Sequence, residues 1–120
     1  MVQLWESPPG YDVLEPNCPS RRVLTLLADK WVLLVIVALA KKGPLRNGEL
    51  KRVLGDISQK MLVQTLRNLE EFGVVQRTAY NVVPPHVEYQ LTDLGESLLV
   101  PIGALRDWAQ AHTEALPDAR

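Results

Sequence analysis

The sequence predicts a mainly α-helical domain with a small β-hairpin that follows its helices. Three observations indicate this fold class: one helix is apolar nearly all round, two short helices meet at a tight turn, and an alternating hairpin comes directly after them. This order is typical of a winged helix-turn-helix. We expect an N-terminal arm over residues 1–19, the winged helix-turn-helix over 20–91 and a C-terminal dimerisation helix over 92–120.

Length and composition favour one globular domain inside the cell. The chain has 120 residues, 47% of them hydrophobic and 22% charged, which are ordinary values for one domain. A single cysteine, Cys18, excludes an internal disulfide and a multi-cysteine metal site, and we expect no cofactor. The longest apolar run, Trp31–Ala40, has ten residues and is too short to span a membrane, and the first residues do not resemble a signal peptide. We therefore expect a cytoplasmic protein.

The first two helices are predicted from prolines, caps and apolar spacing. Prolines interrupt the arm, and Ser20 is expected to cap a first helix over Arg21–Leu27. The second helix, Lys30–Lys41, should begin after Asp29 as N-cap and end at Gly43. Because its sequence WVLLVIVALA is apolar on all sides, this helix should form the centre of the core. The inward side chains expected in the first helix are Val23, Leu24 and Leu27.

The third and fourth helices are predicted to form the helix-turn-helix. After a short strand at Leu45–Arg46, Asn47 is a good N-cap for a helix over Gly48–Leu54. The next helix should begin after Ser58 as N-cap and end at Gly73, which follows it as the C′ residue. Its core face is expected to comprise Leu62, Leu66 and Leu69, with Met61 and Phe72 extending it.

The outer face of this fourth helix carries long amide and cationic side chains. Lys60, Gln64, Arg67 and Asn68 recur at helical spacing, and such side chains can reach base edges and phosphates. From residue 41 to residue 80 the chain has eight Lys or Arg and four Asp or Glu, a net charge of +4, whereas the remainder carries five against ten, or −5. A basic middle between acidic ends indicates a face that meets a polyanion, although a merely solvated face is the alternative.

A wing and a final amphipathic helix are predicted after residue 73. Val74–Tyr80 alternates as a strand, with Asn81–Pro85 as a turn and Val87–Leu91 as the returning strand. Thr92 should cap a last helix, in which Pro101 should cause a kink or start a new segment. Its apolar stripe is wide enough to pack on a second subunit rather than only on its own core, and the stripe comprises Leu98, Ile102, Leu105 and Ala109, widened by Leu94, Pro101 and Trp108.

At this point the chain resembles the HxlR-type winged-helix transcriptional regulators, from about Cys18 to His112. The similar elements are CPSRRVLTLLADKW (Cys18–Trp31), GPLRNGELKRVLGDISQKMLVQTLRNLEEFGVVQR (Gly43–Arg77), VPPHVEYQLTDLG (Val83–Gly95) and a late tryptophan, Trp108. The resemblance implies a homodimeric DNA-binding protein that is not an enzyme, with its terminal segments building the dimer. Two departures from the family pattern are Asn47, where phenylalanine is usual, and His86, where arginine is frequent.

The resemblance also implies which residues contact DNA. The positions that face the major groove in the family's recognition helix correspond here to Ser58, Gln59, Lys60, Gln64 and Arg67. Arg77 and the turn ending at His86 correspond to its wing, beside the flanking backbone or minor groove. Arg46, Lys51 and Arg52 are further phosphate candidates, for which plain surface charge is an equal alternative.

An effector is also expected, either an oxidant or a small molecule. Cys18 precedes a helix N-terminus beside Arg21 and Arg22, surroundings that favour a reactive thiolate, and some members of the family sense oxidants with a cysteine in this region. A small buried thiol is the alternative. A ligand pocket between the core helix and the dimer helices, lined by Trp31 and Trp108, is a further hypothesis against plain core packing.

We therefore expect a sequence-specific transcriptional regulator, a repressor, that binds a near-palindromic double-stranded DNA operator as a homodimer. The alternative is a winged-helix module for protein–protein contact without a DNA partner. An enzyme is disfavoured because the sequence shows no phosphate loop, metal-ligand cluster or nucleophile–base pair. His86 lies in a proline turn and His112 near a helix end.

Overall fold

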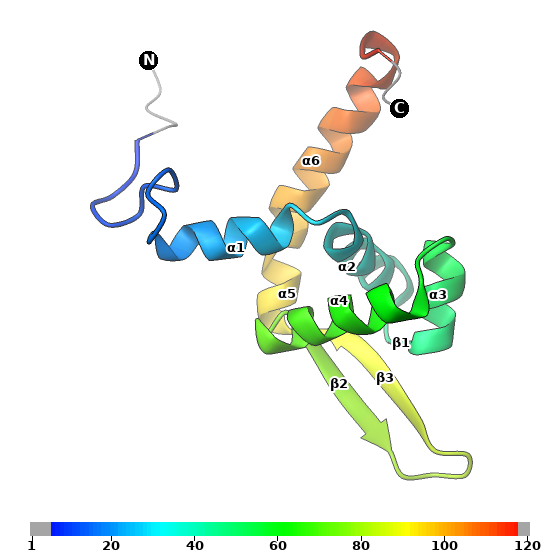
Figure 1. The fold of residues 1–120 in the computed structure, drawn as a ribbon. Coiled ribbons are helices and arrows are strands. Elements are labelled where there is room, and N and C mark those ends of the chain that lie inside the picture. Colours follow the sequence, from blue (N-terminus) through cyan, green and yellow to red (C-terminus); the bar gives the residue numbers. More distant parts are fainter. Residues whose placement is uncertain (1–5, 118–120) are drawn as a thin grey trace.

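The computed structural model describes residues 6–117 and confirms a mainly helical fold with a small β-sheet (Figure 1). The elements are α1 (Pro19–Leu27), α2 (Lys30–Lys42), β1 (Leu45–Arg46), α3 (Asn47–Leu54), α4 (Gln59–Glu71), β2 (Val75–Tyr80), β3 (His86–Leu91), α5 (Asp93–Ser97), α6 (Leu99–His112) and a 3₁₀ turn at Thr113–Ala115. In Figure 1 the β2–β3 hairpin extends below α4, α6 projects in the opposite direction, and α1 reaches out to one side.

Helix α2 forms the centre of the core, as its apolar sequence predicts. Its buried side chains are Val32, Val35, Ile36, Ala38 and Leu39. The Asp29 carboxylate accepts hydrogen bonds from the Trp31 and Val32 backbone N–H groups at 2.7 and 3.3 Å, which confirms this residue as N-cap. Gly43 ends the helix with φ of 77°, a conformation that glycine adopts without steric cost.

No single helix within residues 6–117 is long and apolar enough to cross a membrane. Only α1 and α2 taken together, with a bend of 73° between them, reach the necessary length and composition.

Helix α1 differs from its prediction in both its start and its buried face. Pro19 occupies the first position, where its missing N–H costs nothing, so Cys18 rather than Ser20 stands at the N-cap position. Val23 and Leu24 were expected inside, but they are 43% and 49% exposed. Leu26 is the buried side chain instead, because α1 extends sideways from the body and packs on α2 near its C-terminal end.

Helix α3 begins one residue earlier than predicted. Arg46 rather than Asn47 stands at the N-cap position. The Glu49 carboxylate accepts a hydrogen bond from the Arg46 backbone N–H at 2.8 Å, so a side chain in the first turn reaches back to stabilise the start of the helix. The Asn47 side chain is not used as a cap, so it can accept a hydrogen bond from α4.

The sheet has three antiparallel strands in the order β1-β3-β2. The hairpin register pairs Val75 with Leu91 and Tyr80 with His86. Strand β2 begins one residue later than predicted and β3 one residue earlier, whereas both strands end where predicted. The short strand β1 pairs Leu45 with Tyr89 on the other edge of β3. The predicted wing is therefore anchored to the segment that precedes α3.

The predicted last helix is two helices, and their break lies before Pro101. Helix α5 ends at Ser97 and α6 begins at Leu99, which places Pro101 in the first turn of α6. That position is favourable for proline, because N–H groups of the first turn have no partner within their own helix. The Thr92 hydroxyl accepts a hydrogen bond from the Gly95 N–H at 3.1 Å, which confirms Thr92 as the N-cap of α5.

Gly95 is buried where α5 crosses Val74, and we expect that this position does not tolerate a side chain. A Cβ atom there would overlap the Val74 carbonyl oxygen and approach Leu91 Cδ2 to 3.1 Å. Gly95→Ala should lower the free energy of unfolding by about 2 kcal/mol or more, through overpacking. Urea denaturation measures this change. Gly48→Ala is the matched control, because nothing lies within 4 Å of a Cβ atom at Gly48, and equal stability of both variants would contradict the close contact.

Candidate nucleic-acid interface

Helix α4 is anchored to the core along one narrow stripe. Leu62, Leu66 and Leu69 are at most 2% exposed, as their spacing predicts. Thr65 belongs to the same stripe and is also buried, although its polar side chain gave no apolar signal in the sequence. Met61 was expected to extend the core face, but it is 42% exposed.

The opposite face of α4 is open along its length. The predicted contact residues Ser58, Gln59, Lys60, Gln64 and Arg67 are all exposed. The Ser58 hydroxyl accepts a hydrogen bond from the Met61 N–H at 3.1 Å, which confirms it as the N-cap. Gly73 follows the helix with φ of 75°, as expected of the C′ residue.

The turn between α3 and α4 is fixed by two side-chain hydrogen bonds. Lys51 Nζ donates to the Ile57 carbonyl at 3.1 Å, across the turn. Gln59 Nε2 donates to Asn47 Oδ1 at 3.0 Å, from the first turn of α4 to the first turn of α3. Asn47, the residue that departs from the usual phenylalanine, therefore orients Gln59. Lys51 is partly buried by its bond, unlike the exposed Arg46 and Arg52.

Asn68 does not share the open face with Lys60 and Arg67 as the helical spacing predicted. It is partly buried on the side of α4 that faces α1 and α2, and its Oδ1 accepts a hydrogen bond from Gln64 Nε2 at 3.0 Å. Gln64 is exposed. One hydrogen bond thus connects the open face of α4 with the inner side of the helix.

The wing, which is the β2–β3 hairpin, carries both polar and apolar exposed side chains. Arg77 is exposed on β2. His86 stacks on Tyr80 with ring centroids 4.9 Å apart, and its Nε2 lies 3.3 Å from a carboxylate oxygen of Glu88. The imidazole is therefore held against the hairpin, with a side-chain exposure of 19%. At the tip, Val83 is 99% exposed.

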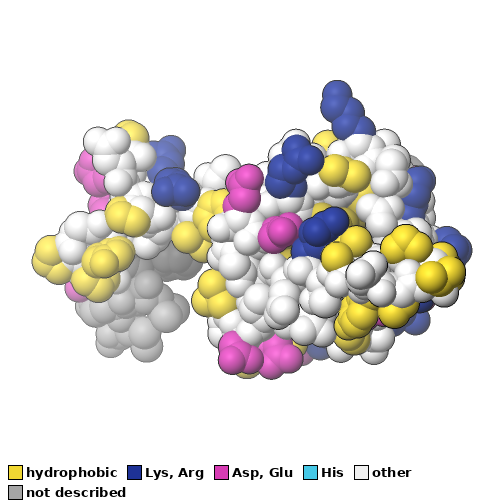
Figure 2. Space-filling view, turned by 90° about the horizontal axis from the view of Figure 1, so that it is seen from below, with side chains coloured by type: hydrophobic (Ala, Val, Ile, Leu, Met, Phe, Trp, Pro, Cys, Tyr) yellow, Lys and Arg dark blue, Asp and Glu magenta, His cyan; other side chains and the backbone are white. Residues whose placement is uncertain are grey.

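Lys and Arg side chains gather around the α3, α4 and wing part of the molecule. Figure 2 views this part from the side toward which the wing extends, and basic side chains border its upper and right-hand edges. The acidic side chains in this view lie mainly to the left and along the lower edge. In α4 the acids Glu70 and Glu71 stand at the C-terminal end, away from Lys60 and Gln64.

Cys18 lies at the N-cap position of α1 and is 5% exposed, with a free thiol. A cavity of about 270 Å³ beside it is lined by Gly10, Asp12, Glu15 and Asn17. The Arg21 guanidinium, expected beside the thiol, donates instead to the Leu14 carbonyl at 3.3 Å. The cavity beside this cysteine is therefore lined by two acidic residues, and neither Arg21 nor Arg22 lines it.

The predicted apolar stripe of the last helix is buried only in its middle, because Leu94 at its N-terminal end is 56% exposed. Ile102 is 8% exposed and Leu98 is partly buried, whereas Leu105 and Trp108 are 56% and 53% exposed. Ala109 is also exposed. Trp108 stacks on His112 with ring centroids 4.4 Å apart, and the distal part of α6 extends away from the body.

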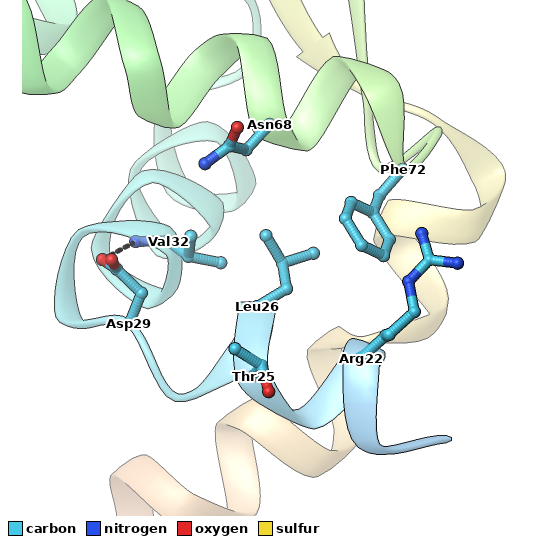
Figure 3. A pocket seen from close by; sticks show the side chains of 7 residues that line it. All are labelled: Arg22, Thr25, Leu26, Asp29, Val32, Asn68 and Phe72. Atoms are coloured by element: carbon cyan, nitrogen blue, oxygen red, sulfur yellow. Dashed lines mark hydrogen bonds between the residues drawn. The ribbon is translucent and has the colours of Figure 1, made fainter. Parts of the chain in front are cut away.

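Cavities of about 180, 320 and 500 Å³ lie next to the core helix, and neither Trp31 nor Trp108 lines any of them as hypothesised. The smallest lies between α2 and α6, and the next lies at the C-terminal end of α2, beside β3. The largest of the three lies between α1, α2 and α4 and is lined partly by Asn68 and Phe72 (Figure 3). No pattern in the sequence indicates this cavity, because three separate helices form it. Within residues 6–117 no group of three or more His, Cys, Asp or Glu side chains could hold a metal ion.

Comparison with known proteins agrees with this arrangement. Residues 26–117 match the family model for an HxlR-like helix-turn-helix. Over 96 residues the chain is 48% identical to YtfH of Escherichia coli (strain K12), an uncharacterized HTH-type transcriptional regulator, which covers 80% of this chain and 75% of that protein.

Two solved structures show the same fold. The ytfH regulator from Salmonella typhimurium is 43% identical with a TM-score of 0.76, covering 85% of this chain and 90% of that one. The redox regulator HypR in its reduced form is 32% identical with a TM-score of 0.74, covering 81% of this chain and 95% of that one. The chain belongs to the HxlR-like helix-turn-helix family of transcriptional regulators.

Proposed function

We propose that this regulator is a repressor that binds a near-palindromic operator in double-stranded DNA as a homodimer. The observation that carries the proposal is the open face of α4, where amide and cationic side chains are exposed and no acid stands before Glu70. A face of this kind fits the major groove, whose base edges present hydrogen-bond donors and acceptors. The wing then lies against the flanking backbone.

The side chains divide by chemistry. Lys60 and Arg67 donate to guanine or neutralise phosphates, and Gln59 and Gln64 suit adenine. The Ser58 hydroxyl, beside the exposed N-terminus of α4, is positioned for a phosphate oxygen. Flanking phosphates are assigned to Arg46, Arg77 and His86, the last when it is protonated. Each phosphate neutralised steepens the salt dependence of binding by about one counterion.

A second copy of the chain is the partner that the terminal helices fit. Leu105 and Trp108 on α6, and Val23 and Leu24 on α1, leave large apolar side chains exposed on the two elements that extend from the body. Single exposed apolar residues are ordinary, but a tryptophan and three aliphatic residues on these two helices favour association. A two-fold dimer would present two α4 helices about one DNA turn, roughly 34 Å, apart.

The alternative, a winged helix that docks on another protein, requires an apolar outer face on α4. Polar side chains dominate that face, with Met61 and Val63 at its flanks.

Among the relatives, HypR is a redox regulator. We therefore propose that an oxidant acting on Cys18 regulates DNA binding, the N-terminal residues beside it opening to admit the reagent.

Lys60→Ala combined with Arg67→Ala should abolish operator binding and leave the dimer intact, because it removes both cations of the open face. Duplexes selected from a random pool by the purified protein supply the operator, and a gel shift measures affinity. Lys30→Ala with Arg106→Ala is the control, since it removes the same charge from exposed positions distant from α4's open face. Unchanged affinity of the first variant would refute the assignment of this face.

Leu105→Ala combined with Trp108→Ala should shift the protein from dimer to monomer in sedimentation velocity, because it truncates the exposed apolar side chains of α6. Val82→Ala with Val83→Ala, at the exposed wing tip, should leave the dimer unchanged. A dimer that persists in the α6 variant at low micromolar concentration would place the interface elsewhere.

Cys18→Ser should remove any response of DNA binding to diamide, because the chain has no other thiol. In the wild type, we expect the oxidant to join the Cys18 thiols of two subunits as a disulfide and to weaken operator binding. Gel shift with and without diamide, followed by a reductant, measures this response. A serine variant that still responds would show that the sensor is not this thiol.

A further inference from the structure

The cavity between α1, α2 and α4 has the size and the walls of a small-molecule site. Its volume of about 500 Å³ falls within the ~300–1,000 Å³ typical of ligand pockets. Leu26, Val32 and Phe72 supply apolar walls, and in Figure 3 the Leu26 side chain points into the space between the other two helices. This cavity is separate from the open face of α4, but it touches the flank of the same helix next to that face, at Asn68.

A cation and an aromatic ring lie together at one end of the cavity. The Arg22 guanidinium lies 5.8 Å from the centroid of the Phe72 ring (Figure 3). Guanidinium groups bind carboxylates through paired hydrogen bonds, and an aromatic wall beside them accommodates a flat apolar body. This end of the cavity therefore suits the acid group of a planar molecule.

Asp29 lies at the opposite end. Its Oδ1 accepts hydrogen bonds from the Trp31 and Val32 N–H groups, so the carboxylate is fixed in place by the start of α2. Its second oxygen can accept a further hydrogen bond from a ligand. This negative end would repel an acid group and suits a hydrogen-bond donor.

Asn68 lies above the cavity, on α4. Its Oδ1 is engaged by Gln64 Nε2 at 3.0 Å, and Figure 3 shows its amide nitrogen on the cavity side. A ligand group here must accept from Asn68 and donate toward Asp29. A hydroxyl group does both.

We propose that this cavity binds a small aromatic carboxylate whose far end carries a hydroxyl group, and that this ligand lowers the affinity of α4 for DNA. The acid group binds Arg22, the ring packs among Leu26, Val32 and Phe72, and the hydroxyl bonds Asn68 and Asp29. By fixing Asn68, the ligand holds the Gln64 amide against the helix and withdraws it from the DNA. This last step rests on the proposed DNA-binding function, whereas the binding step does not.

Isothermal titration of the DNA-free protein with 4-hydroxybenzoate tests the site. Arg22→Gln should weaken binding about tenfold or more, because it removes a charge-assisted hydrogen bond to the carboxylate. Arg21→Gln is the matched control: it removes the same charge one residue away, from a guanidinium that bonds the Leu14 carbonyl and does not line the cavity. Both arginines are exposed, so neither variant should disturb the fold.

Two further ligands test the polarity of the site. Benzoate should bind more weakly than 4-hydroxybenzoate because it lacks the hydroxyl, and methyl 4-hydroxybenzoate should bind more weakly because it lacks the charge. No binding of 4-hydroxybenzoate at millimolar concentration, or equal binding by the Arg22 and Arg21 variants, would overturn the proposal.

Gel shift of the selected operator, with and without 4-hydroxybenzoate, tests the regulation. The ligand should lower the affinity of the wild type severalfold, and Asn68→Ala should remove that effect, because the link to Gln64 is lost. Ligand binding without any effect on DNA affinity would overturn the regulatory step alone. Absence of operator binding in the ligand-free protein would instead count against the proposed function, and the titration would still decide the site.

Discussion

The burial of α2 is the constraint on which the rest of the structure depends. Val35 and Ile36 have no exposed surface, and α1, α3, α4, α6 and β3 all contact this helix. Burying one large aliphatic side chain contributes about 1.5–3 kcal/mol, so a helix with five buried residues must be covered on most of its sides. The other elements pack around α2 and cover it. Because each of them turns one face toward α2, its remaining face is directed toward the solvent.

Packing on α2 also positions the open face of α4. Its leucines fix the side that meets the core, and hydrogen bonds from Lys51 and Gln59 fix its start relative to α3. Its end is held where the Thr92 hydroxyl donates to the Gly73 carbonyl and α5 crosses Val74 at Gly95. Because both ends are held, the open face has one orientation relative to the wing.

The proposed DNA-binding groups and the proposed dimer contacts lie on different elements. The exposed polar groups assigned to DNA belong to α4, β1 and the wing, whereas the exposed apolar groups assigned to the dimer belong to α1 and the distal part of α6, which extend away from the wing (Figure 1). One chain can therefore meet DNA and a second copy at the same time. The larger cavity lies between these regions, with α1 as one wall and α4 as another, which is a suitable place for a regulatory ligand.

The sequence by itself determined the features that depend on neighbouring residues. Caps at Asp29, Ser58 and Thr92, the leucine spacing of α4 and the presence of the strand β2 are local, and the structure confirms each of them. The tertiary structure decided the features that depend on distant segments. Val23 and Leu24 are exposed because no other part of residues 6–117 covers that side of α1, and the close contact of Gly95 with Val74 brings α5 against the end of α4. The Asn47–Gln59 bond and the cavity beside Asn68 arise only when separate helices meet, because no periodicity along the chain encodes a contact between two of them.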